Sequence, residues 1–220
     1  MFRFRQLLLL AALAAVLVHA APSAAQTIID EWQSVKAPPA PALKAVTLDP
    51  KSTAMLVMDF VNQTCNNEKR PRCVASIPKI EKLQAAARAQ GVMLISTTVP
   101  PVPIADTLPA VAPKGDEPVV VVVALVDKFM LGNKDTGLEK MLRDKGVTTV
   151  VIVGTAANGA VLYTSSAAAL RGRNVVVPVD GMSGDNTYVE QSVAYILTSA
   201  PGGIAAKITL TSAEMIKFAN

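Results

Sequence analysis

The feature that most constrains the fold of this chain is a series of short apolar runs that alternate with helical patterns. The runs cover residues 54–58, 92–97, 119–126, 148–153 and 174–179, with a shorter one at 208–210. Their length and their many β-branched residues predict strands. Because they are apolar throughout instead of alternating with polar residues, we expect both faces of the sheet to be covered.

Helical segments with recognisable ends lie between these runs. Ser76 is a candidate N-cap, with Pro78 in the first turn of the helix that follows. We expect this helix to end at about Gln90, before Gly91. Further helices are expected at residues 137–145, 158–171 and 187–199. The repeated strand–helix–strand order predicts one α/β domain over residues 51–220, with a parallel sheet between two layers of helices.

The first 25 residues have the pattern of a signal peptide. Arg3 and Arg5 precede an uncharged apolar stretch at residues 7–18, and small residues at 23–25 form a cleavage signature. The alternative is a membrane anchor, but the apolar stretch is shorter than the roughly 20 residues that span a bilayer. We therefore expect a periplasmic or secreted protein with no stable membrane anchor after cleavage.

Residues 26–50 form a proline-dotted segment with a lone tryptophan, Trp32. We expect an extended arm with one short helical turn near Glu31. The arm could wrap over the domain or over a partner subunit. A loosely ordered tail is the alternative, and the sequence leaves both open.

Composition excludes several kinds of function. Without residues 1–25 the chain keeps 19 basic and 17 acidic residues, so it lacks the charge typical of nucleic-acid-binding proteins. The basic cluster at residues 69–72 therefore indicates a solvated loop. The single histidine, His19, lies in the leader, so the mature chain cannot use a Ser–His or Cys–His pair or a zinc site with imidazole ligands. We expect no metal ion and no cofactor.

Two charged side chains follow predicted strands at the edge of the sheet where ligands bind. Asp59 comes directly after the first strand, and Lys128 follows the run at residues 119–126. A partly desolvated carboxyl group has a raised pKa and suits acid–base catalysis. A structural ion pair would leave the same pattern, so both interpretations are open. We also expect Asn62, in the loop after Asp59, to contact a small-molecule ligand.

A turn of small residues at 154–160 leads from a predicted strand into a helix. Backbone N–H groups at the start of that helix suit an anion or a developing oxyanion. We therefore expect Ala156, Ala157 and Gly159 to contact a substrate. Close packing of the helix on the sheet is the alternative explanation for the small residues.

The chain resembles the isochorismatase-like cysteine hydrolase superfamily over about residues 53–200. The motifs that carry this resemblance are Asp59, Lys128, Gly154-x-x-x-x-x-Ala160-Val161, Thr136-x-Leu138, Leu142-x-x-x-Gly146, residues 167–172 and Val179-Asp180-Gly181-Met182. The resemblance implies a three-layer α/β/α fold with a six-stranded parallel sheet, and a homo-oligomer. It also implies a site made of Asp59, Lys128 and residue 160, with oxyanion-hole amides near Ala156 and Ala160. A cis peptide bond between Thr155 and Ala156 is a further implied feature.

The chain departs from the family at the nucleophile. The family's catalytic cysteine falls on Ala160, and a methyl group cannot attack a carbonyl carbon. Neither Cys65 nor Cys73 can replace it, since both lie in the loop after the first strand. The branch of isochorismatases proper cleaves a vinyl ether without a thiol, with the aspartate as general acid. The resemblance therefore leaves acid-assisted chemistry at Asp59 and Lys128 open, while thiol-dependent hydrolysis is excluded.

The two cysteines have a structural explanation. Cys65 and Cys73 bracket a polar loop in a chain that is expected to be exported. Such spacing in an oxidising compartment predicts a disulfide between them.

Two hypotheses for the function follow. In the first, the chain is an exported hydrolase-like protein that acts on or binds a small molecule, with any catalysis acid-assisted and not thiol-mediated. In the second, it is a periplasmic pseudoenzyme that serves as a small-molecule-binding or assembly protein.

Overall fold

The computed structural model describes residues 27–120 and 124–219, so the expected signal peptide lies outside the described residues. The chain divides into two compact units, Met1–Pro39 and Ala40–Asn220. In the first unit, helix α1 (Ile28–Glu31) forms where a helical turn is predicted. Thr27 is the N-cap residue, and the side chain of Asp30 in the first turn reaches back to it: Oδ2 of Asp30 accepts from the N–H and hydroxyl groups of Thr27, at 2.8 and 2.9 Å.

The expected boundary at residue 50 lies inside the second unit. Strand β1 (Val46–Leu48) pairs in parallel with β10 (Ile216–Phe218) near the C-terminus. The N–H group of Lys44 also donates to the carbonyl group of Leu210 at 2.9 Å. Main-chain hydrogen bonds therefore join residues 44–48 to the C-terminal part of the chain.

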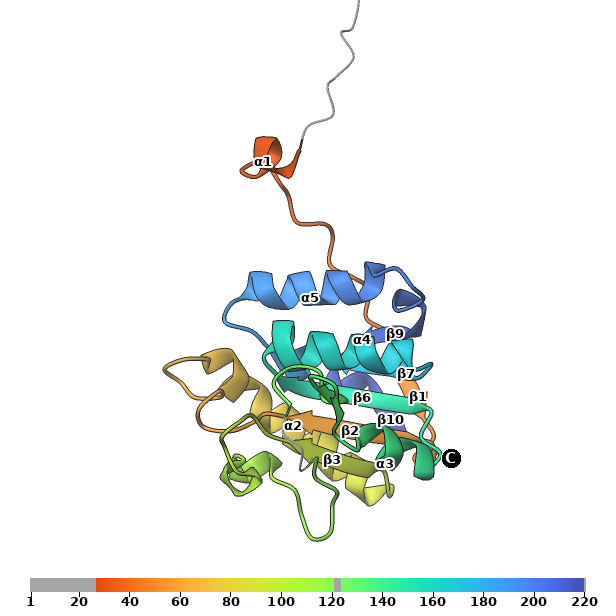
Figure 1. Cartoon of the computed structure of the whole chain (residues 1–220). Helices are drawn as coiled ribbons and strands as arrows, with labels where there is room; N and C mark the ends of the chain where they lie inside the picture. The colour runs from red at the N-terminus through yellow and green to blue at the C-terminus, as the bar shows by residue number, and fades with distance from the viewer. Residues whose placement is uncertain (1–26, 121–123, 220) are drawn as a thin grey trace, which may run out of the picture. The chain divides into compact units, whose positions relative to one another are not determined.

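A six-stranded parallel sheet forms the centre of the second unit, as predicted (Figure 1). Its strands are β2 (Thr53–Met58), β3 (Met93–Thr97), β6 (Thr149–Thr155), β7 (Asn174–Pro178), β8 (Met182–Ser183) and β9 (Ile208–Thr211). The order is β3-β2-β6-β7-β9, and β8 pairs with the last residues of β6. Since neighbouring strands run in parallel, their carboxyl ends meet at one edge of the sheet.

Helices cover both faces of this sheet, with α2 on one side and the other three on the opposite side (Figure 1). They are α2 (Pro71–Ala89), α3 (Leu138–Asp144), α4 (Leu162–Leu170) and α5 (Thr187–Ser199). Successive side chains of β2 enter opposite apolar clusters: Met55 joins Ile80 of α2, and Leu56 joins Leu142 of α3 and Leu197 of α5. All six residues of β2 are therefore buried, which confirms the prediction from continuous apolar runs.

Short elements complete the unit. They are the hairpin β4 (Met130–Leu131) and β5 (Lys134–Asp135), and the single turns η1 (Ile104–Asp106), η2 (Pro109–Val111), η3 (Ala157–Val161), η4 (Val179–Gly181), η5 (Ala205–Lys207) and η6 (Ala213–Met215). Among the described residues, none of the helices has the length and apolar character needed to cross a membrane.

The prediction of a strand at residues 119–126 is wrong where the structure describes this run. Val119 forms only an isolated parallel bridge with Ser96, and residues 121–123 lie outside the described part of the chain. The sixth strand is instead β8, which is too short for its pattern to be recognised in the sequence.

The predicted start of α2 is also wrong. The helix begins at Pro71, and Ser76 lies inside it, where its hydroxyl group donates to the carbonyl group of Cys73 at 2.7 Å. The first turn of a helix tolerates proline, so a helix can begin near Pro71 or near Pro78. The sequence pattern around these two prolines does not decide between the two starts. With the start at Pro71, arginines at the beginning of α2 form ion pairs with residues far away in the sequence, as described below.

Candidate active site

Asp59 lies directly after β2, where the chain leaves the sheet. Its φ of 65° is positive, and among the described residues it is the one non-glycine residue with this property. Aspartate tolerates the left-handed region better than most residues. The N–H group of Asp59 donates to the carbonyl group of Thr97 at 3.3 Å, and its own carbonyl group accepts from the hydroxyl group of Thr64 at 2.6 Å. These bonds hold Asp59 at the carboxyl end of the strand.

Lys128 and Asp59 form a buried ion pair. Nζ of Lys128 lies 2.8 Å from Oδ2 of Asp59, and the two side chains are 0% and 1% exposed. The ammonium group also donates to the carbonyl groups of Ala124, at 2.7 Å, and Thr98, at 3.4 Å. The hydroxyl group of Thr97 donates to Oδ1 of Asp59 at 2.7 Å. The three donors of the ammonium group thus have three protein acceptors, and both carboxylate oxygens are bonded.

Burial governs the acidity of Asp59. It raises the pKa of the carboxyl group above the ordinary value of 3.8, because the charged form loses its hydration. The charge of Lys128 and the hydrogen bonds from Lys128 and Thr97 oppose this effect on the pKa.

The small-residue turn begins at the end of β6, where the strands lie very close together. A Cβ atom at Gly154 would lie 3.0 Å from Cβ and 3.1 Å from the carbonyl oxygen of Met58, so this contact with β2 requires glycine. The peptide bond between Thr155 and Ala156 is cis, as the resemblance implies. The π-helical turn η3 follows and leads into α4, with non-helical backbone angles at Gly159.

Ala160 lies in η3 and is 2% exposed. Together with Ala157 and Val161 it belongs to the apolar cluster on the α3, α4 and α5 side of the sheet. A methyl group therefore packs in the core at residue 160, the position at which the resemblance predicts the nucleophile. The other two predicted contacts of this turn, Ala156 and Gly159, are partly exposed.

Asn62 has a different environment from Asp59 and Lys128. It is exposed, and its carbonyl group accepts a hydrogen bond from the side chain of Asn66 at 2.7 Å. The structure therefore joins Asp59 to Lys128 in one contact, whereas the described contact of Asn62 lies within its own loop.

Sequence reasoning missed two polar contributors next to the ion pair. Thr97 and Thr98, at and after the end of β3, are each 2% exposed. The hydroxyl group of Thr97 donates to Asp59, whereas Thr98 accepts from Lys128 through its main-chain carbonyl group. A hydroxyl group at the end of an otherwise apolar strand is the signal that could have identified Thr97, while a carbonyl contact leaves no signal in the sequence.

Arg70 was also missed, and the expected solvated loop at residues 69–72 is wrong for its two arginines. Nη1 of Arg70 donates to Oγ1 of Thr155 at 2.6 Å, and Nε and Nη2 donate to Oδ1 of Asp185 at 3.0 and 2.7 Å. Arg72 pairs with Glu190 through two hydrogen bonds. No local pattern signals these contacts, since Thr155 and Asp185 lie 85 and 115 positions from Arg70.

The predicted disulfide between Cys65 and Cys73 is confirmed. Their Cα atoms are 5.3 Å apart, and both residues are buried beside α2. Cys73 lies in the first turn of α2, so the bond ties the start of this helix to the loop after β2.

Several solved structures have a fold similar to that of this chain. An isochorismatase family protein from Desulfovibrio vulgaris has a TM-score of 0.61 and 21% identity, covering 74% of this chain and 95% of that one. A cysteine hydrolase from Pseudomonas syringae has a TM-score of 0.64 and 20% identity, covering 79% and 94%. N-carbamoylsarcosine amidase from Thermoplasma acidophilum has a TM-score of 0.57 and 17% identity, covering 74% and 97%. At these identities the likeness establishes the fold.

The sequence itself establishes the family. Residues 53–201 match the isochorismatase domain, which is more than half of the chain. The chain therefore belongs to the isochorismatase family. A comparison with curated proteins gave no match.

Proposed function

We propose that this chain is a non-catalytic member of the isochorismatase family, a pseudoenzyme that binds a small molecule or a protein partner without hydrolysing it. The observation that carries the proposal is the state of the family site. Asp59 and Lys128 are closed to solvent and bonded to each other, while residue 160 is an alanine in the apolar core.

On this proposal two catalytic functions are lost, that of the nucleophile and that of the activating lysine, each for a physical reason. Thiol-dependent hydrolysis needs a nucleophilic sulfur atom, which Ala160 lacks. A lysine that activates a nucleophile or polarises a substrate needs a free donor, and the donors of Lys128 are used by Asp59, Ala124 and Thr98. This arrangement favours the structural interpretation of the ion pair.

Acid-assisted hydrolysis is the second candidate, and one observation favours it. Burial raises the pKa of Asp59, so its carboxyl group holds a proton to a higher pH than an exposed aspartate does. A protonated carboxyl group can protonate the leaving oxygen of a vinyl ether, after which water completes the hydrolysis.

A substrate panel separates the two candidates. The mature protein is incubated with amides, esters and vinyl ethers, and turnover is compared with the Asp59→Asn variant, whose fold is checked by circular dichroism. We expect no turnover above that of the variant. Vinyl ether cleavage that is lost in Asp59→Asn would overturn the proposal in favour of acid catalysis.

We further propose that the protein is exported to the periplasm or secreted. The disulfide between Cys65 and Cys73 supports this, since structural disulfides persist in oxidising compartments. Cell fractionation with intact-mass analysis tests it, and a full-length chain in the cytoplasm would contradict it.

A further inference from the structure

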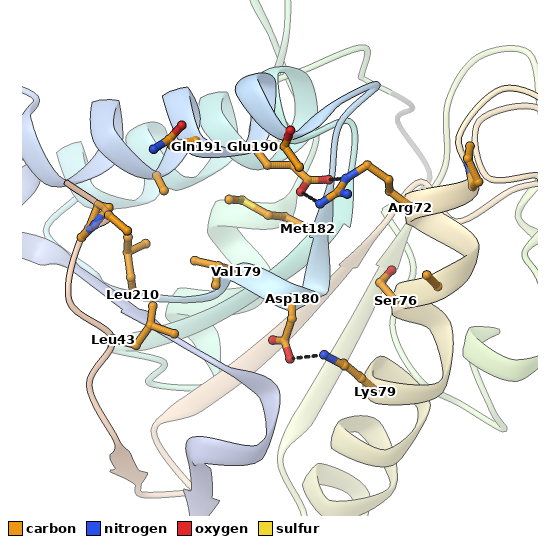
Figure 2. A pocket seen from close by; sticks show the side chains of 16 residues that line it. Leu43, Arg72, Ser76, Lys79, Val179, Asp180, Met182, Glu190, Gln191 and Leu210 are labelled. Carbon is orange, nitrogen blue, oxygen red and sulfur yellow. Dashed lines mark hydrogen bonds and ion pairs between the residues drawn. The ribbon is translucent and has the colours of Figure 1, made fainter. Parts of the chain in front are cut away.

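A pocket of about 830 Å³ lies between the first half of α2, the segment around η4 and β8, and helix α5 (Figure 2). Its walls are mainly apolar and include Leu43, Val179, Met182, Ala194 and Leu210. None of Asp59, Lys128 and Ala160 is among its lining residues. The volume is that of a site for a small organic molecule.

Two ion pairs cross the rim of this pocket, as Figure 2 shows. Lys79 pairs with Asp180 at 3.1 Å, and Arg72 pairs with Glu190. Both basic residues belong to α2 and both acidic residues lie on the opposite wall. The four charges cancel, so the rim of the pocket carries no net charge.

The acidic side chain of each ion pair is held in place by a further hydrogen bond from the main chain. Oδ1 of Asp180 accepts from the N–H group of Ala213 at 2.8 Å, and Oε1 of Glu190 accepts from that of Gly184 at 3.0 Å. Their side chains are 23% and 14% exposed. Each acid therefore keeps a main-chain partner if its basic partner moves.

The basic members are the more exposed ones and have unused donors. Lys79 and Arg72 are 57% and 43% exposed. The ammonium group of Lys79 has three donors and bonds to Asp180 alone among the described residues. The contacts of Arg72 within the described chain use Nε and Nη2, which leaves the two donors of Nη1. An anionic group at the rim can use these donors while both ion pairs remain.

We propose that this pocket binds a small carboxylic acid with an apolar body. The apolar body lies against Val179, Met182 and Leu210, where burial from water drives binding. The carboxylate accepts charge-assisted hydrogen bonds from Lys79 and Arg72 at the rim. This inference goes beyond the proposed loss of catalysis and does not depend on it, because the pocket shares no residue with the ion pair of Asp59.

Ala75 offers a direct test of the location. It is exposed on α2 and lines the pocket, so Ala75→Trp fills the space without disturbing the core. Ala85→Trp, on an exposed position of the same helix that does not line the pocket, is the matched control. We expect octanoate to bind the wild type and Ala85→Trp equally in calorimetric titration. Binding to Ala75→Trp should be at least about tenfold weaker, at an unchanged melting temperature of the free protein.

Two comparisons test the chemical class. Octanamide, which has the same chain and no charge, should bind the wild type about tenfold more weakly than octanoate. Lys79→Gln should remove most of this difference, whereas Lys145→Gln, an exposed lysine on another helix end, should not. Equal binding of octanoate to Ala75→Trp, equal binding of the two probes to the wild type, or no binding of octanoate would each overturn the proposal.

Discussion

Position 160 carries a methyl group that is almost fully buried among apolar side chains. The surroundings of residue 160 are therefore those of a core position, whereas Asp59 and Lys128 pair with each other at 2.8 Å.

Introducing a cysteine at position 160 is the first prediction. In Ala160→Cys, the new thiol group lies in apolar surroundings, which disfavour the thiolate, so we expect a pKa above the ordinary value of about 8.5. The pH dependence of alkylation measures this pKa, with the Cys65–Cys73 disulfide left intact so that one thiol reports. Rapid alkylation with a pKa well below 8.5, joined by esterase activity, would show a site that still activates a nucleophile.

Removing the lysine is the second prediction, and it depends on pH. In Lys128→Met, Asp59 loses the charge that lowers its pKa, so its folded pKa rises further above 3.8. A pKa that is higher in the folded than in the unfolded state gives stability below the unfolded pKa, and this stability is lost as the pH rises through the folded pKa. We expect a loss of roughly 3–5 kcal/mol at about pH 8 and a smaller loss at about pH 4.

Urea unfolding across this pH range measures the effect. The double variant Asp59→Asn/Lys128→Met has no titrating carboxyl group at this site and serves as the control, so its loss should not grow with pH. A loss in Lys128→Met that is the same at both pH values would contradict the assignment to Asp59.

At the scale of elements, the first turn of α2 has three attachments to the rest of the fold. Cys73 is bonded to Cys65, Arg70 contacts Thr155 and Asp185, and Arg72 contacts Glu190. The disulfide was predicted from the spacing of the cysteines together with the expected export of the chain. The helix start was misplaced at Ser76, because the contacts of Arg70 are formed across more than 80 positions.

The third prediction concerns this disulfide. The two cysteines are 8 positions apart, and on the chain-entropy model closing so short a loop stabilises the folded state by roughly 2–3 kcal/mol. Reduction, or the variant Cys65→Ala/Cys73→Ala, should lower the free energy of unfolding by about this amount in urea titration. Intact mass before and after alkylation supplies the control, and two free thiols in unreduced exported protein would contradict the bond.

The strands were more predictable than the helix starts. Continuous apolar runs predicted β2, β3, β6, β7 and β9, because burial on both faces leaves a pattern within one short segment. The same rule failed for the run at residues 119–126, where Val119 forms only an isolated bridge and Leu125 and Val126 are exposed. An apolar run in the sequence indicates that a segment is buried. Whether the segment pairs with a neighbouring strand depends on residues elsewhere in the chain.

At the scale of the molecule, the outer surface of α4 and α5 is short of charge. Glu190 is the single charged residue of these two helices, and it is paired with Arg72. All three tyrosines of the chain, Tyr163, Tyr188 and Tyr195, lie here and are 52%, 72% and 47% exposed. An uncharged, tyrosine-rich surface meets a second copy of itself without repulsion, as a two-fold interface requires.

The fourth prediction is that the homo-oligomer expected from the family forms through this surface. Tyr195→Arg should produce a monomer in size-exclusion chromatography with light scattering, because charge would be brought together at the interface. Leu131→Arg, a similarly exposed apolar residue on the β4–β5 hairpin, should leave the assembly unchanged. A monomeric wild type, or dissociation by both variants, would contradict this surface.

Asp59 was predictable because it follows a buried strand, and it lies at the carboxyl end of β2. Lys128 was chosen because it follows the apolar run at residues 119–126, and it contacts Asp59 although that run does not form a strand where the structure describes it. The pocket beside Lys79 and Asp180 left no such signal, because it is formed by helix faces that are more than 100 positions apart in the chain.

The left-handed backbone of Asp59 has a consequence for which residues position 59 can accept. At a φ of 65°, glycine, asparagine and aspartate are the residues that fit without much strain. Glycine would leave the buried ammonium group of Lys128 without a counter-charge, and asparagine would leave it with a neutral partner. Selection for folding is therefore enough to keep an acid at position 59, whether or not its carboxyl group takes part in chemistry. On the proposed loss of catalysis, we expect the buried pair of Asp59 and Lys128 to persist for its contribution to stability alone.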